Sequence, residues 1–203
     1  MKKIIVDILL LILMLIQFSK VYLTSEIHEI IGISLILLVI IHIILNRKYI
    51  KAIPNGKYNS KRKILLITNA GFLIVFCSTC ILGLLSSHSV LTFMNISNLT
   101  TNYLHKIFAY LSIIFLGIHL GTNLTGLLKR IEKKLSNKLL IITIYSLLII
   151  CGIYSFIHLD FYNHLIGNSG FSIVTGILTL NILEYLTIIA MITILANLVY
   201  RKL

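Results

Sequence analysis

Four of the seven histidines in the 203-residue sequence occur at matched spacings. Fourteen positions separate His28 from His42, and the same number separates His105 from His119. In an α-helix, fourteen steps of about 100° return to within about 40° of the start, with a rise of roughly 21 Å. Each of two helices would therefore present two imidazoles on one face, one near each end.

Imidazole nitrogens are good ligands for iron, and a haem takes axial ligands from both of its faces. If the two helices face each other, His28 can meet His105 and His42 can meet His119. We therefore predict two haems of the b type, each held by one histidine pair. A lone histidine in an apolar helix can simply hydrogen-bond to a neighbouring helix, but two identical spacings favour ligation.

The residues that follow these histidines repeat as well. Gly32 and Ala109 each come four positions after the first histidine of a pair, where a small side chain leaves room for a flat macrocycle. Asn46 and Asn123 each come four positions after the second histidine. These asparagines could contact haem propionates or cap the ends of their helices.

Long apolar segments must position these residues. The sequence is 58% hydrophobic with a mean hydropathy of +1.02, which is typical of a chain embedded in a bilayer. Each segment approaches the length of about 20 residues that a helix needs to cross the hydrocarbon core, and only helices or closed barrels satisfy their backbone there. We predict an all-α, polytopic membrane bundle of about six transmembrane helices, near residues 4 to 23, 27 to 46, 64 to 87, 103 to 127, 138 to 158 and 171 to 199.

The basic residues indicate how the bundle is oriented. Sixteen of the 18 Lys and Arg residues precede span one, lie in the loops after spans two and four, or follow span six. Because cytoplasmic loops are enriched in basic residues, we predict that both the N- and C-termini are cytoplasmic. The charge of +12 thus reflects topology and contact with membrane lipid, and we expect no nucleic acid as a partner.

The loops between the spans are short, so residues 1-203 are expected to form a single integral membrane domain. The histidines place the haem-binding core of four helices at about residues 1-130, and two additional helices follow at about 138-200. Spans two and four run in the same direction in this topology, which makes their repeat parallel.

With these features, the chain resembles the bis-histidine membrane cytochromes related to cytochrome b and the ferric reductases. His28-Glu29-x-x-Gly32, His42-x-x-x-Asn46 and the basic loop that follows are most similar to the flavinylation-associated cytochrome family, over about residues 1 to 130. The resemblance implies electron transfer across the cytoplasmic membrane of the cell. The donor would be a quinol or a reductase, and the acceptor an extracytoplasmic redox protein that can carry flavin.

The sequence has no glycine-rich nucleotide-binding motif and no soluble domain to hold a flavin. We therefore expect an electron-carrier component of an oxidoreductase system and not a self-contained enzyme. An alternative is a haem-free transporter or scaffold whose histidines bind metal or relay protons. A third possibility is a thiol oxidoreductase that uses Cys77 and Cys80, although a CxxC inside an apolar helix is more typical of buried packing.

Several polar residues lie outside this pattern. His88, His158 and His164 occur at or near the outer loops, where they could form a quinone or metal site. Glu184 lies within span six, and we expect it to face the interior of the bundle.

Overall fold

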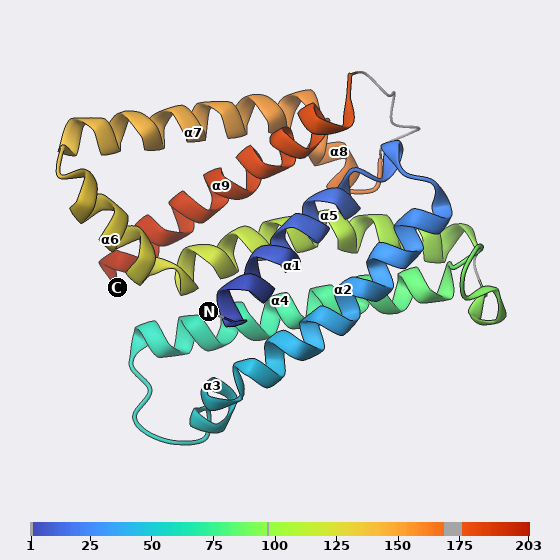
Figure 1. The fold of residues 1–203 in the computed structure, drawn as a ribbon, viewed down its shortest axis with the longest axis horizontal. Coiled ribbons are helices and arrows are strands. Elements are labelled where there is room, and N and C mark those ends of the chain that lie inside the picture. Colours follow the sequence, from blue (N-terminus) through green and yellow to red (C-terminus); the bar gives the residue numbers. More distant parts are fainter. Residues whose placement is uncertain (1, 97, 169–175) are drawn as a thin grey trace.

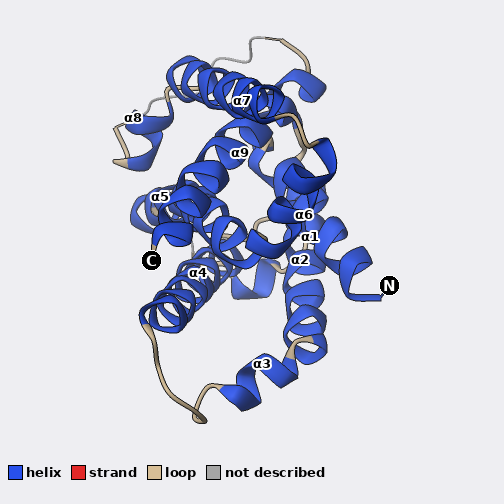
Figure 2. Cartoon of the chain, turned by 90° about the vertical axis from the view of Figure 1, so that its left-hand side faces the viewer, coloured by secondary structure: helices blue, strands red, loops and turns tan. Residues whose placement is uncertain are grey.

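The computed structural model describes residues 2–96, 98–168 and 176–203, and every regular element in these ranges is a helix (Figure 2). In chain order the elements are α1 (Lys2–Phe18), η1 (Lys20–Tyr22), α2 (Ser25–Leu45), α3 (Arg47–Ala52), α4 (Ser60–Leu85), η2 (Thr92–Met94), α5 (Leu99–Asn123), α6 (Thr125–Leu135), α7 (Lys138–His158), α8 (Phe161–Leu165) and α9 (Leu178–Lys202).

Five helices of the described chain, α2, α4, α5, α7 and α9, are long and apolar enough to cross a membrane. The predicted all-α class is confirmed, and these five helices support the prediction of a multi-pass membrane protein. The first predicted span corresponds to α1, whose 17 residues extend roughly 25 Å. Because α1 ends at Phe18 and the chain turns through η1, it is shorter than the run of apolar residues from 4 to 23.

Polar side chains mark where the long helices begin. Each N-cap side chain accepts a hydrogen bond from a backbone N–H in the first turn, which satisfies a donor that the helix itself cannot. The capping residues are Thr24 for α2, Asn59 for α4, Asn98 for α5 and Asn137 for α7. The predicted starts near 27, 64 and 103 therefore lie two to four residues after the observed starts of α2, α4 and α5.

Two further predicted boundaries, the end of span four and the start of span six, were wrong. Span four was expected to continue to 127, but α5 ends at Asn123, whose side-chain amide donates to the backbone oxygen of His119 at 2.8 Å. The last span was expected from 171, but α9 begins at Leu178 and residues 169–175 lie outside the described residues. Apolar composition continued through both of these ends, so hydropathy alone did not reveal them.

Four of the long helices form a row, and a hairpin made of α1 and α2 lies beside it. Viewed end-on in Figure 2, α7, α9, α5 and α4 follow one another, and α1 and α2 stand to one side. The hairpin contacts the row through α1 on α9 and α2 on α4. Figure 1 shows both termini, α3 and α6 toward one end, which we call the basic end, and η1, η2 and α8 toward the opposite end.

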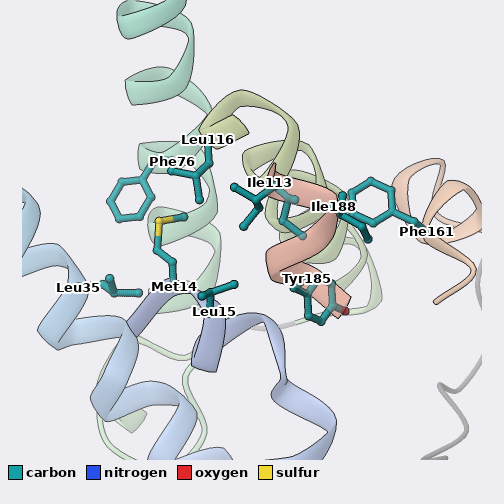
Figure 3. Packing of buried hydrophobic residues seen from close by; sticks show 10 residues of the cluster. Met14, Leu15, Leu35, Phe76, Ile113, Leu116, Phe161, Tyr185 and Ile188 are labelled. Atoms are coloured by element: carbon teal, nitrogen blue, oxygen red, sulfur yellow. The ribbon is translucent and has the colours of Figure 1, made fainter. Parts of the chain in front are cut away.

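The apolar core lies where α1 meets the other helices. Met14 and Leu15 of α1 lie between Leu35 of α2 and Ile113 of α5, and all four side chains are buried (Figure 3). Burying each of these side chains contributes about 1.5–3 kcal/mol. The C-terminal half of the short helix α1 therefore packs between α2 and α5, while Ile4, Ile5 and Ile8 of its first half are exposed.

Close contact between α5 and α9 depends on two glycines spaced four residues apart. A Cβ on Gly117 would lie 2.6 Å from Cβ of Ile192, and one on Gly121 would lie 2.6 Å from the backbone oxygen of Thr193. The buried Asn197 uses this proximity, because its side-chain amide donates to the backbone oxygen of Gly121 at 2.7 Å. Small residues and interhelical hydrogen bonds of this kind are what drive helix association in membranes.

At the basic end, Glu132 of α6 joins the ends of two spans. Arg201 of α9 donates to both of its carboxylate oxygens, at 2.9 and 2.8 Å, and the hydroxyl of Tyr145 of α7 donates to Oε1 at 2.7 Å. The hydrogen bonds from Arg201 hold the pKa of Glu132 below its usual value. The charged form of Glu132 is therefore the form that stabilises the fold.

We expect Glu132→Gln to lower stability by about 1–2 kcal/mol at neutral pH, because Arg201 loses its charged partner. Since the pKa is depressed in the folded state, this contribution is complete above the unfolded value of about 4.3 and is lost as pH falls through the folded value. Thermal unfolding of both proteins in detergent between pH 7 and pH 3 measures the difference. Glu26→Gln, a change at an exposed acid, should show no such pH-dependent loss. A difference between wild type and Glu132→Gln that does not shrink as the pH is lowered would contradict the assignment.

Candidate functional site

The structure brings His28 of α2 and His105 of α5 together at the opposite end of the bundle. Their ring centroids are 6.3 Å apart and their planes are at 88°. With nitrogen–metal bonds of about 2.0 Å, two imidazoles on opposite sides of one metal ion have centroids roughly 6.2 Å apart. The centroid separation of this pair matches that of two axial ligands.

A cavity of about 760 Å³ surrounds the pair and is lined by both helices. Besides the two histidines, its lining includes Gly32 and Ala109, the small residues that the repeat singled out. The cavity exists because α2 packs mainly on α1, whereas α5 packs mainly on α4 and α9. Its volume lies within the range of about 300–1,000 Å³ that is usual for cofactor sites.

The orientation of His105 is fixed by the neighbouring helix α4. Its Nδ1 lies 3.0 Å from the backbone oxygen of Thr79, to which it must donate because the oxygen can only accept. Gly83, one turn further along α4, faces the same ring, and a Cβ there would lie 2.9 Å from Cε1 of His105. The Nδ1–H tautomer leaves the Nε2 lone pair of His105 available for a metal.

His28 has a different environment. The side-chain amide nitrogen of Gln17 on α1 lies 3.1 Å from Nε2 of His28. Nδ1 of His28 and Oε1 of Gln17 are both buried and have no hydrogen-bond partner among the described residues. Because buried polar atoms are nearly always paired, this part of the cavity is suited to a ligand that engages the imidazole.

At the basic end, His42 and His119 are also oriented through Nδ1. Nδ1 of His42 lies 2.7 Å from a carboxylate oxygen of Asp7, and Nδ1 of His119 lies 3.0 Å from Oδ1 of Asn69. The ring of Phe72 lies beside His119, with centroids 5.2 Å apart. Three of the four repeated histidines thus donate through Nδ1, the tautomer that leaves Nε2 without a proton. At His42, Nε2 lies 3.3 Å from the side-chain amide nitrogen of Asn46.

The two asparagines of the repeat cap their own helices. The side-chain amide of Asn46 donates to the backbone oxygen of His42 at 2.9 Å, and that of Asn123 makes the same bond to His119 at 2.8 Å. Asn123 also donates to Oδ1 of Asn69 at 2.8 Å, which places it in the same network as the His119 ring. Of the two roles considered from the sequence, the structure shows the capping role.

Sequence reasoning missed most of the residues that orient the histidines. Asp7, Asn69 and the backbone of Thr79 lie 35, 50 and 26 positions from their partners, and none follows the repeat. Asp7 gave the one available signal, because it is an acid within an otherwise apolar segment. The other two carry no pattern that a single sequence reveals.

Glu29, next to His28, holds the loop that follows α4. Its carboxylate accepts hydrogen bonds from the hydroxyl of Ser87 at 2.6 Å and from the backbone N–H groups of His88, Ser89 and Val90 at 2.6–3.2 Å. Charge-assisted bonds of this kind are among the stronger ones in proteins. The loop is thereby fixed over the end of the cavity.

The cysteines and the membrane acid were also singled out from the sequence. Cys77 is exposed and Cys80 is partly buried at the cavity wall, and both are free thiols. Glu184 is buried, as expected, but because α9 starts at Leu178 it lies near the opposite end and not deep in the span. There its Oε1 lies 2.6 Å from Nδ1 of His158.

In the part of the chain that the structure describes, no group of three or more His, Cys, Asp or Glu side chains is placed to hold a metal ion. A bare ion usually needs more than two protein ligands, whereas haem iron needs only two because the macrocycle supplies the other four. Two histidines, as in the His28–His105 pair, are the number of protein ligands that a haem iron takes.

No protein-family model, curated protein or solved structure matches this chain. The histidine geometry is therefore the basis on which its function is inferred.

Proposed function

We propose that this chain is a transmembrane b-type cytochrome that carries two bis-histidine haems and passes electrons between the two faces of the membrane. His28 and His105 would hold the haem at the opposite end, and His42 and His119 the haem at the basic end. When bound, each haem supplies an iron that accepts and releases one electron. The chain supplies the axial ligands, their orientation and an apolar surrounding that excludes water.

The separation of 6.3 Å between the rings of His28 and His105, across a cavity between two parallel helices, is the observation that carries the proposal. The Nδ1 hydrogen bonds of His105, His42 and His119 support it, because they pre-orient Nε2 and reduce the entropy lost on ligation. Gly32 and Ala109 support it by keeping bulk away from the cavity beside the pair.

The proposal includes an orientation and partners. The basic end, with both termini, would face the cytoplasm across the cell membrane by the positive-inside bias. In that topology α1 is a sixth crossing helix, whose short length is accommodated by local thinning of the bilayer. A quinol or reductase would donate electrons, and an extracytoplasmic redox protein, flavin-bearing in the family that the chain resembles, would accept them.

Electron transfer across sealed proteoliposomes tests this function. With ferricyanide trapped inside and ascorbate outside, the haem-loaded protein is expected to bleach the trapped ferricyanide faster than protein-free liposomes. A His42→Ala, His119→Ala double variant, which retains only the other pair, should bleach at the background rate. Background bleaching by the haem-loaded wild type would contradict the proposal.

Gly83 offers a more local prediction. A valine there would drive its side chain into the His105 ring, which cannot move without losing its bond to Thr79. We expect Gly83→Val to lose the haem of this pair and to retain the other, so the haem measured per chain falls by about half. Cys77→Val, on the exposed side of the same helix, should keep the full content, and an unchanged haem content in Gly83→Val would count against the assigned pocket.

A further inference from the structure

The cavity beside His28 and His105 has a second wall, which the haem assignment does not use. Residues from α7, α8 and α9 line it: His158, His164, Glu184 and Tyr185. Tyr110 of α5 lies between the two walls. The same space is therefore lined both by the two imidazoles that we assign to a haem and by a separate set of side chains that can bind protons.

Specific contacts join these side chains into two groups. The carboxylate of Glu184 lies 2.6 Å from Nδ1 of His158, and the hydroxyls of Tyr110 and Tyr185 lie 3.1 Å apart. The ring of His164 stacks on that of Tyr110, with centroids 4.7 Å apart and planes at 10°. Burial, followed by the nearby positive charge of Lys106, lowers the pKa of His164, so that ring is neutral at neutral pH.

Burial differs sharply within the Glu184–His158 pair. The Glu184 side chain is 9% exposed, whereas that of His158 is 40% exposed. A proton taken up by the carboxylate inside the cavity can therefore pass through the imidazole to the surface at the opposite end. A structural ion pair would not need to join the cavity to the surface in this way.

We infer that this wall binds a hydroquinone, with Glu184 as the acceptor of its hydroxyl proton and His158 as the exit to the surface. The inference rests on the proposed function, because the electrons need the haem iron as acceptor. Oxidation of a hydroquinone to the quinone breaks two O–H bonds and releases two protons and two electrons. The protons would leave through Glu184 and His158, and two bound haems, each able to accept one electron, would take up the two electrons.

The site is suited to this class of substrate for two reasons. The stacked rings of Tyr110 and His164, and the tilted pair of Phe18 and Tyr185, line the cavity and offer aromatic faces to a quinone ring. The cavity is also lined by residues of helices that are long and apolar enough to cross a membrane, where an apolar donor is soluble. A water-soluble donor would gain nothing from such a lining.

Binding can be tested without turnover, by titrating the purified chain in detergent with the fluorescent hydroquinone analogue 2-heptyl-4-hydroxyquinoline N-oxide. We expect saturable quenching of the probe by the wild type, and at least a tenfold weaker affinity for Glu184→Gln. Glu26→Gln, the same change at an exposed acid outside the cavity lining, should bind like the wild type. Equal affinity of Glu184→Gln and wild type, or no binding to the wild type, would overturn the inference.

A second measurement separates this inference from the proposed function. The haem content of Glu184→Gln should equal that of the wild type, while its reduction by a short-chain naphthohydroquinone should be at least tenfold slower. Normal haem content with an unchanged reduction rate rejects the hydroquinone site alone. Absence of haem from the wild type rejects the proposed function, and with it the route for the electrons.

Discussion

Replacing His105 with alanine is expected to remove one haem and spare the other, so that the purified chain falls from about two haems to about one. In the proposed cytochrome, His105 would supply one axial ligand of this haem, and its partner His28 would not hold the group from one side alone. His42 and His119, at the basic end, should be unaffected because their imidazoles are oriented by Asp7 and Asn69 at the other end of the bundle. Quantifying haem against protein for each variant measures the effect.

The other histidines provide the controls for this experiment. His119→Ala should give the reciprocal result, with loss of the haem at the basic end and retention of the other. His88→Ala, at a loop histidine outside both pairs, should retain both haems. Full haem content in both His105→Ala and His119→Ala would show that these histidines are not axial ligands.

The largest effect on stability is expected from Gly121→Leu. Its new side chain would meet the backbone of α9, which has no rotamer to move, and would separate Asn197 from the backbone oxygen of Gly121. Overpacking costs about 1–3 kcal/mol and the lost hydrogen bond about 1 kcal/mol more. Thermal unfolding in detergent, followed by circular dichroism, should show a strongly lowered midpoint or an unfolded protein.

Gly126 is the matched control, because a Cβ there would meet no atom within 4 Å. Gly126→Leu changes the same residue type in the next helix, so it accounts for the change in helix propensity alone. We expect its midpoint to stay within a few degrees of the wild type. Equal midpoints for Gly121→Leu and Gly126→Leu would contradict the close packing of α5 on α9.

The fold could be predicted from hydropathy because the bilayer demands long apolar helices. Where the sequence failed, local chemistry outweighed composition. Asn123 ends α5 within an apolar run by donating to the backbone of His119, and α1 ends at Phe18 although the next residues remain partly apolar. The glycines of α5 were not recognised as a packing surface, because their partner, α9, is some 70 residues away in sequence.

The candidate site was predictable only where it repeats. The four histidines and the small residues beside them share a spacing that helical geometry converts into shared depth. The groups that orient them come from other helices and have no such register, so Asp7, Asn69 and Thr79 emerged only from the structure. The same is true of the Glu184–His158 pair. Both residues were singled out from the sequence, but nothing in the sequence indicated that they are in contact.

The absorption spectrum of the detergent-purified chain, reduced with dithionite minus oxidised in air, tests the central claim most directly. We expect a sharp α-band of the b type, with about two haems per chain by chemical quantification. A flat difference spectrum, from protein that was produced with ample haem and remains folded, would contradict the cytochrome assignment.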